Sequence, residues 1–340
     1  MPAGGPRGYY SSPDKNLIRE QFDLPLLERL HSINGDSLGY FGLPGEELRD
    51  IRCWGHLLGE VAAVEKDSSH LLAIDETVKM EMPGLRFTPH LGDVDRVILD
   101  GRGEKWDRGG QPHQPSVGRY DLAHDVTGWF FNVVNLDYYG PFLPESGGGK
   151  ARSRANALRK LFEIERLDAR NRWVLMVTVA AQKLRPDLNT EIIAYLKGIQ
   201  DDANTEASEA LKFLTHPTGG MRSLSNTRII HGVTAALIHL AASNSNLTAI
   251  PRGTVLYRGA SNQPMVHLAY EFEPHAGSMP PPTPLLNLLN SPILTISEDG
   301  GNREIGLLGA QPPSMTEANV RNTLEFLDNR EVDRIVAQLI

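Results

Sequence analysis

Short apolar runs alternate with amphipathic segments along the first half of the chain, between residues 38 and 181. Each run is apolar almost throughout, without the regular polar positions of a half-exposed strand, which is typical of strands buried on both faces. The predicted strands are residues 38–41, 61–64, 85–89, 129–136 and 173–179. Because helix-like segments separate them, the sequence predicts an α/β fold with a mostly parallel, Rossmann-like sheet and helices on both faces.

The pattern changes after residue 186. Two helices are predicted over residues 188–214 and 227–242, followed by strand-like runs at 254–257 and 265–272. A turn between Gly259 and Pro264 joins these two runs, which indicates a C-terminal antiparallel β-hairpin. Residues 102–121 break the alternation and are predicted to form a long irregular insertion.

The two ends of the chain are predicted to lie outside this α/β unit. Residues 1–36 form an N-terminal lead with a helix that Pro25 interrupts, and residues 37–275 form the α/β domain. A proline-rich linker opens the segment 276–340, which is predicted to be a helical extension with a capping box of Ser314 and Glu317. Its last helix carries an apolar stripe that needs cover from the main domain, a protein partner or a second copy, namely Val332, Ile335, Val336 and Leu339.

Composition narrows the class of protein. Of the 340 residues, 40% are apolar and 22% are charged, as in a globular protein. The formal net charge of -8 argues against indiscriminate nucleic-acid binding, although it does not exclude a local basic face. Cys53 is the only cysteine, which excludes an intrachain disulfide and a cysteine-based zinc site. With no signal-like N-terminus and no apolar run of about 18 residues, we expect a cytoplasmic and bacterial protein without a membrane contact.

The first predicted strand ends in a glycine-containing loop, Tyr40-Phe41-Gly42-Leu43-Pro44-Gly45. Glycines at such a loop let the main chain approach a ligand, since no Cβ stands in the way. Glu65 ends the second predicted strand, 23 residues after Gly42, where a carboxylate can bind a ribose diol. Asp93 follows the third strand and could accept a hydrogen bond from an adenine amino group.

The fourth strand ends in Asp137-Tyr138-Tyr139-Gly140. Together with the loop, the two acids and the hairpin, this arrangement resembles the class I S-adenosylmethionine-dependent methyltransferases over residues 37–273. The resemblance implies that Phe41, Gly42 and Gly45 line the cofactor, that Glu65 holds its ribose and that Asp93 holds its adenine. It also implies that Asp137, Tyr138 and Tyr139 face the methyl group and its acceptor.

Two departures from that family pattern leave other functions open. The loop lacks the usual acid near the strand end and has fewer glycines, and the two prolines of the D-P-P-Y motif are replaced. A non-catalytic methyltransferase-like subunit and a small-molecule methyltransferase are therefore alternatives to an enzyme that acts on nucleic acid.

A basic segment follows the fourth strand. Residues 150–172 carry eight basic side chains against three acidic ones. The segment is either a solvated helix face or a rim that binds phosphates of a nucleic acid through Arg152, Arg154, Arg159 and Lys160. In the second case Tyr138 and Tyr139 would stack on a base, which makes a nucleic-acid base the favoured methyl acceptor.

Other sites are disfavoured by missing motifs. The sequence has no G-x-G-x-x-G for a dinucleotide, and Ala151 replaces the Ser or Thr that a P-loop needs after its lysine. There is no G-x-S-x-G elbow of a serine hydrolase. No H-x-x-x-H or H-x-H pair occurs among the 11 histidines, so residues such as His231 and His239 are predicted to pack or to lie at the surface, and no metal site is expected.

Overall fold

The structure of the protein is a computed structural model. It describes residues 12–100, 131–138, 171–181, 222–243, 245, 247–274, 284–299, 301–309 and 311–339, together with residues 154, 156–158 and 160–162. The predicted helix at 188–214, the irregular insertion and Tyr139, Arg152 and Arg159 lie outside the described residues.

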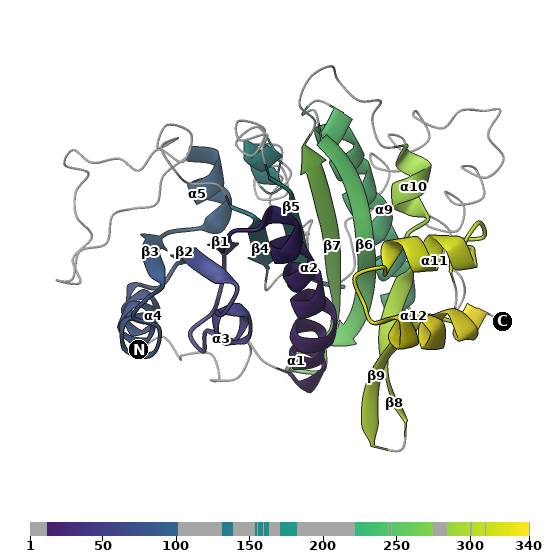
Figure 1. Ribbon diagram of the computed structural model, residues 1–340, viewed down its shortest axis with the longest axis horizontal. Helices are drawn as coiled ribbons and strands as arrows, with labels where there is room; N and C mark the ends of the chain where they lie inside the picture. Colours follow the sequence, from purple (N-terminus) through teal and green to yellow (C-terminus); the bar gives the residue numbers. More distant parts are fainter. Residues whose placement is uncertain are drawn as a thin grey trace.

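The described strands form one nine-stranded sheet in the order β3-β2-β1-β4-β5-β7-β6-β8-β9 (Figure 1). The strands are β1 (Leu38–Gly42), β2 (Leu58–Glu65), β3 (Arg86–Leu91), β4 (Val133–Asp137), β5 (Trp173–Ala180), β6 (Leu247–Arg258), β7 (Pro264–Pro274), β8 (Ile293–Asp299) and β9 (Asn302–Leu307).

Strands β1 to β5 run parallel to one another, as the sequence predicts. β7 is antiparallel to both β5 and β6, so the predicted hairpin is confirmed. β8 then pairs parallel with β6, and β9 pairs antiparallel with β8. The carboxyl ends of β1 to β6 and of β8 consequently meet at one edge of the sheet, whereas β7 and β9 run the other way.

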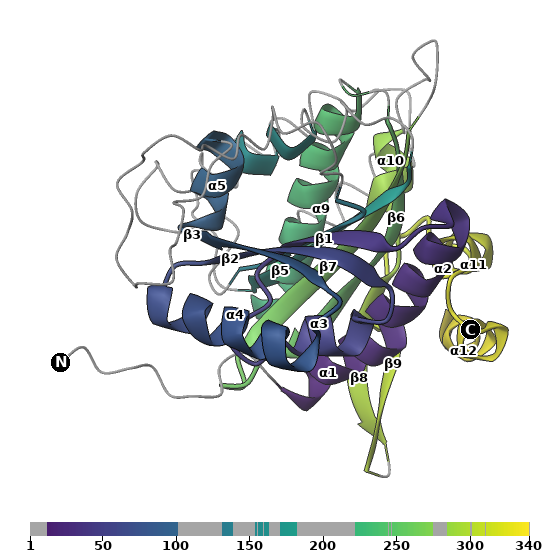
Figure 2. The same cartoon turned by 60° about the vertical axis from the view of Figure 1, so that its left-hand side comes forward.

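Helices cover both faces of the sheet, as predicted (Figure 2). One face carries α3 (Arg49–Trp54) and α4 (Ser68–Glu81), together with the helices at the two ends of the chain. The other face carries α5 (Val94–Asp100), the helical residues between 154 and 162, α9 (Arg222–Ser243) and α10 (Leu285–Leu289). Successive residues of β5 point into opposite cores, which explains why this strand is apolar throughout.

The N-terminal helix is continuous, although the sequence predicts a break at Pro25. α1 (Pro13–Ile18) runs through a π-helical turn, Arg19–Asp23, into α2 (Leu24–Asn34). In the turn the N–H of Leu24 donates to the carbonyl of Arg19, five residues earlier. Pro25 follows in the first turn of α2, where the fixed φ of proline is compatible with a helix and a missing N–H costs little.

The C-terminal segment contains β8 and β9 in addition to the predicted helices α11 (Glu317–Thr323) and α12 (Asn329–Val336). The capping box is formed by Thr316 and Asn319, not by Ser314 and Glu317, because α11 begins two residues later than predicted. Ser314 instead donates to Asn290 Oδ1 at 2.5 Å.

The apolar stripe of α12 packs inside the protein. Val332, Ile335 and Val336 are buried in the same core as the N-terminal helices, so the main domain covers the stripe, which is one of the alternatives that the sequence left open. The adjoining 3-10 turn, Ala337–Leu339, closes the edge of the sheet: Leu307 N donates to Gln338 Oε1 at 2.6 Å. This contact satisfies a main-chain group that an edge strand leaves without a neighbour.

A buried carboxylate ties both ends of the chain to the sheet. Glu271, on β7, has a fully buried side chain that accepts from Arg252 at 2.6 Å, from Arg172 at 2.9 Å and from Arg29 at 3.0 Å. Arg252 and Arg29 also contact Glu325, which follows α11. We call these six charged side chains the Glu271 cluster, namely Glu271, Arg29, Arg172, Arg252, Glu273 and Glu325.

Candidate functional site

The loop after β1 lies at the carboxyl edge of the sheet and begins at a position that only glycine can occupy. A Cβ placed on Gly42 would lie 2.2 Å from the carbonyl oxygen of Asn135 on β4, and Leu43 N donates to that same oxygen at 3.2 Å. Gly45 has a φ of 67°, in the left-handed region that glycine favours. The first glycine therefore serves the close approach of β1 and β4, and the second serves the turn.

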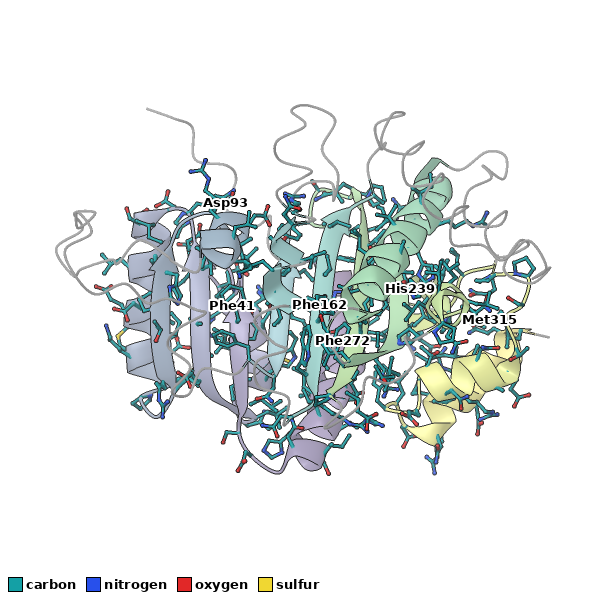
Figure 3. The ribbon with its side chains drawn as sticks, turned by 90° about the horizontal axis from the view of Figure 1, so that it is seen from above. Phe41, Asp93, Phe162, His239, Phe272 and Met315 are labelled. Atoms are coloured by element: carbon teal, nitrogen blue, oxygen red, sulfur yellow. The ribbon has the colours of Figure 1, made fainter. Side chains whose placement is uncertain are left out.

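Phe41 lies inside the protein and not in the loop. Its side chain is 1% exposed and packs against Phe131, with ring centroids 5.2 Å apart. Figure 3 shows Phe41 within the sheet, whereas Asp93 lies at its margin. Phe41 thus supports the loop from the core.

The two predicted cofactor acids lie at the carboxyl ends of neighbouring strands: Glu65 is the last residue of β2, and Asp93 comes two residues after the end of β3. Glu65 Oε1 accepts from the main-chain N–H groups of Lys66 at 2.7 Å and Asp67 at 3.1 Å. Asp93 pairs with Lys66 at 2.8 Å and accepts from the N–H of Asp95 at 3.1 Å. Burial opposes ionisation of Asp93, but these contacts outweigh it and lower its pKa below the ordinary value. The structure thus brings Glu65, together with Asp93 and its lowered pKa, to one side of the glycine loop.

Tyr138 is buried, although the sequence predicts that it stacks on an acceptor. Its ring is 4% exposed, its hydroxyl donates to Asp95 Oδ1 at 2.7 Å, and the Arg154 guanidinium lies 4.2 Å from the ring centroid. Burial raises the pKa of Tyr138 well above its usual value. Burial also raises the pKa of Asp95, which Tyr138 and Arg154 oppose. Because core residues and Arg154 cover the ring, it cannot stack on a base in this arrangement.

Asp137 faces the opposite side of the sheet from Tyr138, toward the N-terminal helix. Its carboxylate contacts Lys15 of α1, and the two side chains are 14% and 16% exposed. The predicted acceptor residue is therefore present at the end of β4, but a lysine that the sequence reasoning did not consider neutralises it.

Further polar contacts continue from Asp137 along the N-terminal helix. Arg19 binds Asp50, which accepts from Asn135 Nδ2 at 2.8 Å. Asp23 lies 2.9 Å from His267 Nε2, and the other ring nitrogen of His267 lies 2.9 Å from Thr178 Oγ1. We call this set the edge network, namely Lys15, Arg19, Asp23, Asp50, Asn135, Asp137, Thr178 and His267.

The edge network encloses a space of about 10 Å³, close to what one water molecule needs. The only sequence signal for it is the spacing of Lys15, Arg19 and Asp23, which places three charges on one side of a helix. Their partners come from α3, β4, β5 and β7, which are far away in the sequence, so the pattern alone could not identify them.

The predicted basic rim is only partly described. Arg154 lies against Asp95 at 3.6 Å and over Tyr138, and Lys160 belongs to the same helical segment. Arg172, at the end of that basic stretch, binds Glu271 and Glu273. Arg154 and Arg172 thus have carboxylate partners within the protein.

The described residues contain no group of three His, Cys, Asp or Glu side chains that could hold a metal ion. His231 contacts Thr254 Oγ1 at 2.7 Å and the carbonyl of Leu289 at 3.1 Å, and burial lowers its pKa to about 4. It is a packing residue, as the sequence predicts. None of the described helices is both long and apolar enough to cross a membrane.

The strand order decides the fold. Seven strands run in the order β3-β2-β1-β4-β5-β7-β6, with only β7 antiparallel to the rest. The chain has the class I methyltransferase fold. In this methyltransferase fold β8 and β9 extend the sheet beyond β6, and the glycine loop, Glu65 and Asp93 lie at the edge where open α/β sheets bind ligands.

Comparisons with solved structures return methyltransferases at low similarity. Trm5b from Pyrococcus abyssi is 9% identical, with a TM-score of 0.38 over 78% of this chain and 51% of that chain. Magnesium protoporphyrin IX methyltransferase (ChlM) from Synechocystis PCC 6803 with bound SAH is 10% identical, with a TM-score of 0.37 over 79% and 90%. An rRNA methylase from Streptococcus thermophilus is 11% identical, with a TM-score of 0.34 over 73% and 94%.

The chain spans about half the length of the Pyrococcus protein. No model of a known protein family matches the sequence, and no curated protein matches it either. Because the three TM-scores are below 0.5, the fold is assigned from the strand order of the sheet itself.

Proposed function

We propose that this protein transfers a methyl group from S-adenosylmethionine, which binds at the carboxyl ends of β1, β2 and β3. The observation that carries this proposal is the pair of acids, Glu65 and Asp93, at the ends of adjacent parallel strands beside the turn after Gly42. Within a class I methyltransferase fold, this edge is where a nucleoside-bearing ligand meets both the loop and the acids.

The geometry of Glu65 fits the ribose of that cofactor. Two main-chain N–H groups hold one oxygen of its carboxylate, and no described residue donates a hydrogen bond to the other, Oε2. An oriented carboxylate of this kind can accept from a ribose hydroxyl. We assign Asp93, which the Lys66 contact keeps ionised, to the adenine amino group, and Gly42 and Gly45 to the side of the loop near the ribose and methionine.

The acceptor is proposed to meet the cofactor at Asp137. The cofactor supplies an electrophilic methyl group, and the protein's own task is to align the acceptor with it and to exclude water. Lys15 binds Asp137 in this structure, so the acceptor must displace Lys15 or use the carboxylate together with it. A nucleic-acid base as acceptor stays a hypothesis, and in this structure Tyr138 gives it no stacking platform.

One observation favours a second candidate function. The Lys15 contact and the covered Tyr138 leave the acceptor end occupied by the protein's own side chains. A methyltransferase-like protein that binds the cofactor and does not catalyse transfer fits that arrangement.

Calorimetric titration with S-adenosylmethionine tests the proposal. Wild type should bind, and Glu65→Ala should bind about ten- to hundredfold more weakly, because it loses charge-assisted hydrogen bonds of about 1.5–3 kcal/mol. Glu76→Ala, which removes an exposed acid from α4, is the matched control and should bind as wild type does. Equal affinity of the Glu65 variant and the control would refute the ribose assignment, and absence of binding to wild type would refute the function.

A further inference from the structure

A second recess lies on the carboxyl edge of the sheet, between β6 and β8. Its volume is about 510 Å³, within the range of roughly 300–1,000 Å³ that small-molecule sites occupy. The pairing of these two strands begins at Thr254 and Ile293 and ends at Leu256 and Thr295, beyond which the strands separate. Beyond that pair, residues 257–258 of β6 still pair with β7, and residues 296–299 of β8 still pair with β9. Their other sides, which would face each other in a continuous sheet, form the two edges between which the recess opens.

The first turn of α1 separates the two strands. If β6 and β8 stayed in register, Ser297 would lie opposite Arg258. Instead the Arg258 N–H donates to Asp14 Oδ2 at 3.0 Å, and Ser12 donates to the Arg258 carbonyl at 2.9 Å. On β6 these two side chains take the place of the hydrogen bonds that a neighbouring strand would make. Among the described contacts, α1 makes no comparable hydrogen bonds to the main chain of β8.

Charges of both signs stand close together on the wall of this recess. Arg303, on β9, donates to Asp14 at 2.9 Å and lies 3.7 Å from Glu298. The Arg303 side chain is 37% exposed and the Glu298 side chain 61%, so solvent and a ligand can reach both. Arg258 adds a second guanidinium to the lining. The wall therefore offers two cations and two anions, of which Asp14 and Glu298 both lie within 3.7 Å of the Arg303 guanidinium.

We propose that this recess binds a small zwitterion of dipeptide size. Its carboxylate would bind Arg303, and its ammonium would bind Asp14 and Glu298. In the structure Arg303 pairs with both of these acids, so a zwitterion offers each of the three groups an ionic partner of the sign that it now has. Its extended main chain would pair with the open strand edge of β8. A polyanion is disfavoured because Asp14 and Glu298 would repel it, and an apolar ligand would leave the four charged groups desolvated.

This site goes beyond methyl transfer and does not depend on it. Tyr257 lines both the recess and the edge network, and Asp14 lies one residue before Lys15. A ligand that displaces the contact between Asp14 and Arg303 would therefore change the contacts of the first turn of α1, the turn that also carries Lys15, the partner of Asp137.

Saturation-transfer NMR on the full chain without cofactor tests the inference. The probes are the free dipeptides Ala-Ala, Ala-Glu and Ala-Lys, each compared with its N-acetylated, C-amidated form. Ser297→Trp fills the recess from an exposed position on β8, and Ser32→Trp places the same side chain at an exposed position on α2 as a control. Arg303→Gln removes the cation and keeps a hydrogen-bonding side chain.

At least one free dipeptide should bind wild type and the Ser32 variant. Binding should be about tenfold weaker or lost for the Ser297 and Arg303 variants and for the blocked dipeptides, which have lost their charges. The inference fails if no free dipeptide binds wild type, or if Ser297→Trp binds as well as Ser32→Trp does. It also fails if a single-stranded RNA decamer binds wild type and Ser297→Trp abolishes that binding, since the recess would then take a polyanion.

Discussion

The N-terminal helix is held to the sheet by two sets of charged side chains, each built around a buried carboxylate and one near each end of the helix. In the Glu271 cluster one carboxylate accepts from three arginines, and burial, which opposes its ionisation, is outweighed so that its pKa is lowered. In the edge network burial raises the pKa of Asp50, and an imidazole and a small enclosed space lie among the charges. In the first set the carboxylate has arginine partners at both oxygens, and its role is structural. The second set contains groups that can change partners, and a carboxyl group, Asp50, whose raised pKa allows it to change protonation.

The position of each set in the sheet explains the difference. Glu271 pairs with Val174 at the start of β5, away from the ligand-binding edge. Thr178 and Asp137 pair with each other at the carboxyl ends of β5 and β4. At the edge of the sheet where β5 begins, a buried ion pair stabilises the fold as long as each charge has its partner, since a missing partner leaves a buried charge that costs free energy. At the carboxyl edge of β4 and β5, polar groups lie where a ligand could compete for them.

Removal of residues 279–340 should have the largest effect, because it deletes Glu325, which contacts Arg29 and Arg252 in the Glu271 cluster. It also removes β8 from the side of β6 and the buried residues of α11 and α12 from the core. We expect the truncated chain to lose cooperative unfolding, measured by circular dichroism during heating. A truncated chain that unfolds cooperatively near the wild-type temperature would contradict this expectation.

Glu271→Gln should have the next largest effect, a loss of about 3–5 kcal/mol in the free energy of unfolding, because the fully buried Arg252 keeps only Glu325, which is half-exposed, as a carboxylate partner. Urea denaturation at pH 7 measures it. Glu273→Gln is the control: Glu273 is 39% exposed and its pair with Arg172 should contribute no more than about 1 kcal/mol. Since the pKa of Glu271 is lowered, its contribution is present above the unfolded value near ~4.3 and should disappear as the pH falls below it.

Asp137→Ala should leave the fold and the cofactor affinity within a fewfold of wild type and abolish methyl transfer, because the proposed contact is made to the acceptor. Asp93→Ala should weaken cofactor binding about tenfold, through loss of one charge-assisted hydrogen bond. The paired measurement is calorimetry with S-adenosylmethionine and transfer of labelled methyl groups to bulk RNA, DNA and cell extract. Full turnover by the Asp137 variant would remove it from the site. A wild type that binds cofactor and labels nothing would favour the non-catalytic protein.

Local sequence patterns predicted the part of the fold that depends on local chemistry. The runs that form β1, β2, β4 and β5 are apolar because both faces are buried, and the hairpin of β6 and β7 has its own turn signal. Strands β8 and β9 were missed although the sequence Gly300-Gly301 is a turn signal, since the nearby proline run suggested a linker. Glu65 and Asp93 were placed correctly at strand ends, because that position follows from strand boundaries alone.

The contacts of Asp137 and Tyr138 could not be predicted in the same way. Asp137 ends β4 and Tyr138 follows it, and the two side chains face opposite sides of the sheet, so Asp137 meets Lys15 and Tyr138 meets Asp95. Those partners are separated from them by 122 and 43 residues. A spacing rule has no information on which side chain will cover another at such a distance in the sequence, and only the packed helices decide it.

Asp50→Asn should produce the smallest effect, and its dependence on pH distinguishes the two sets of charges. Burial and the nearby Asp137 raise the pKa of Asp50, whereas Arg19 and Lys15 oppose the shift. A carboxyl group whose pKa is raised by folding stabilises the protein below its unfolded value near ~3.9, and that contribution disappears as the pH rises through the folded value. Asparagine keeps the shape and cannot ionise. The variant should therefore gain stability relative to wild type between pH 4 and 7, by about 1.4 kcal/mol for each unit of the shift. Urea midpoints at four pH values measure this trend, with Glu271→Gln, which should show the opposite trend, as the comparison. If the stability of wild type instead rises relative to that of Asp50→Asn as the pH rises, the ion pair with Arg19 outweighs burial. The edge network would then be a structural ion-pair contact like the Glu271 cluster.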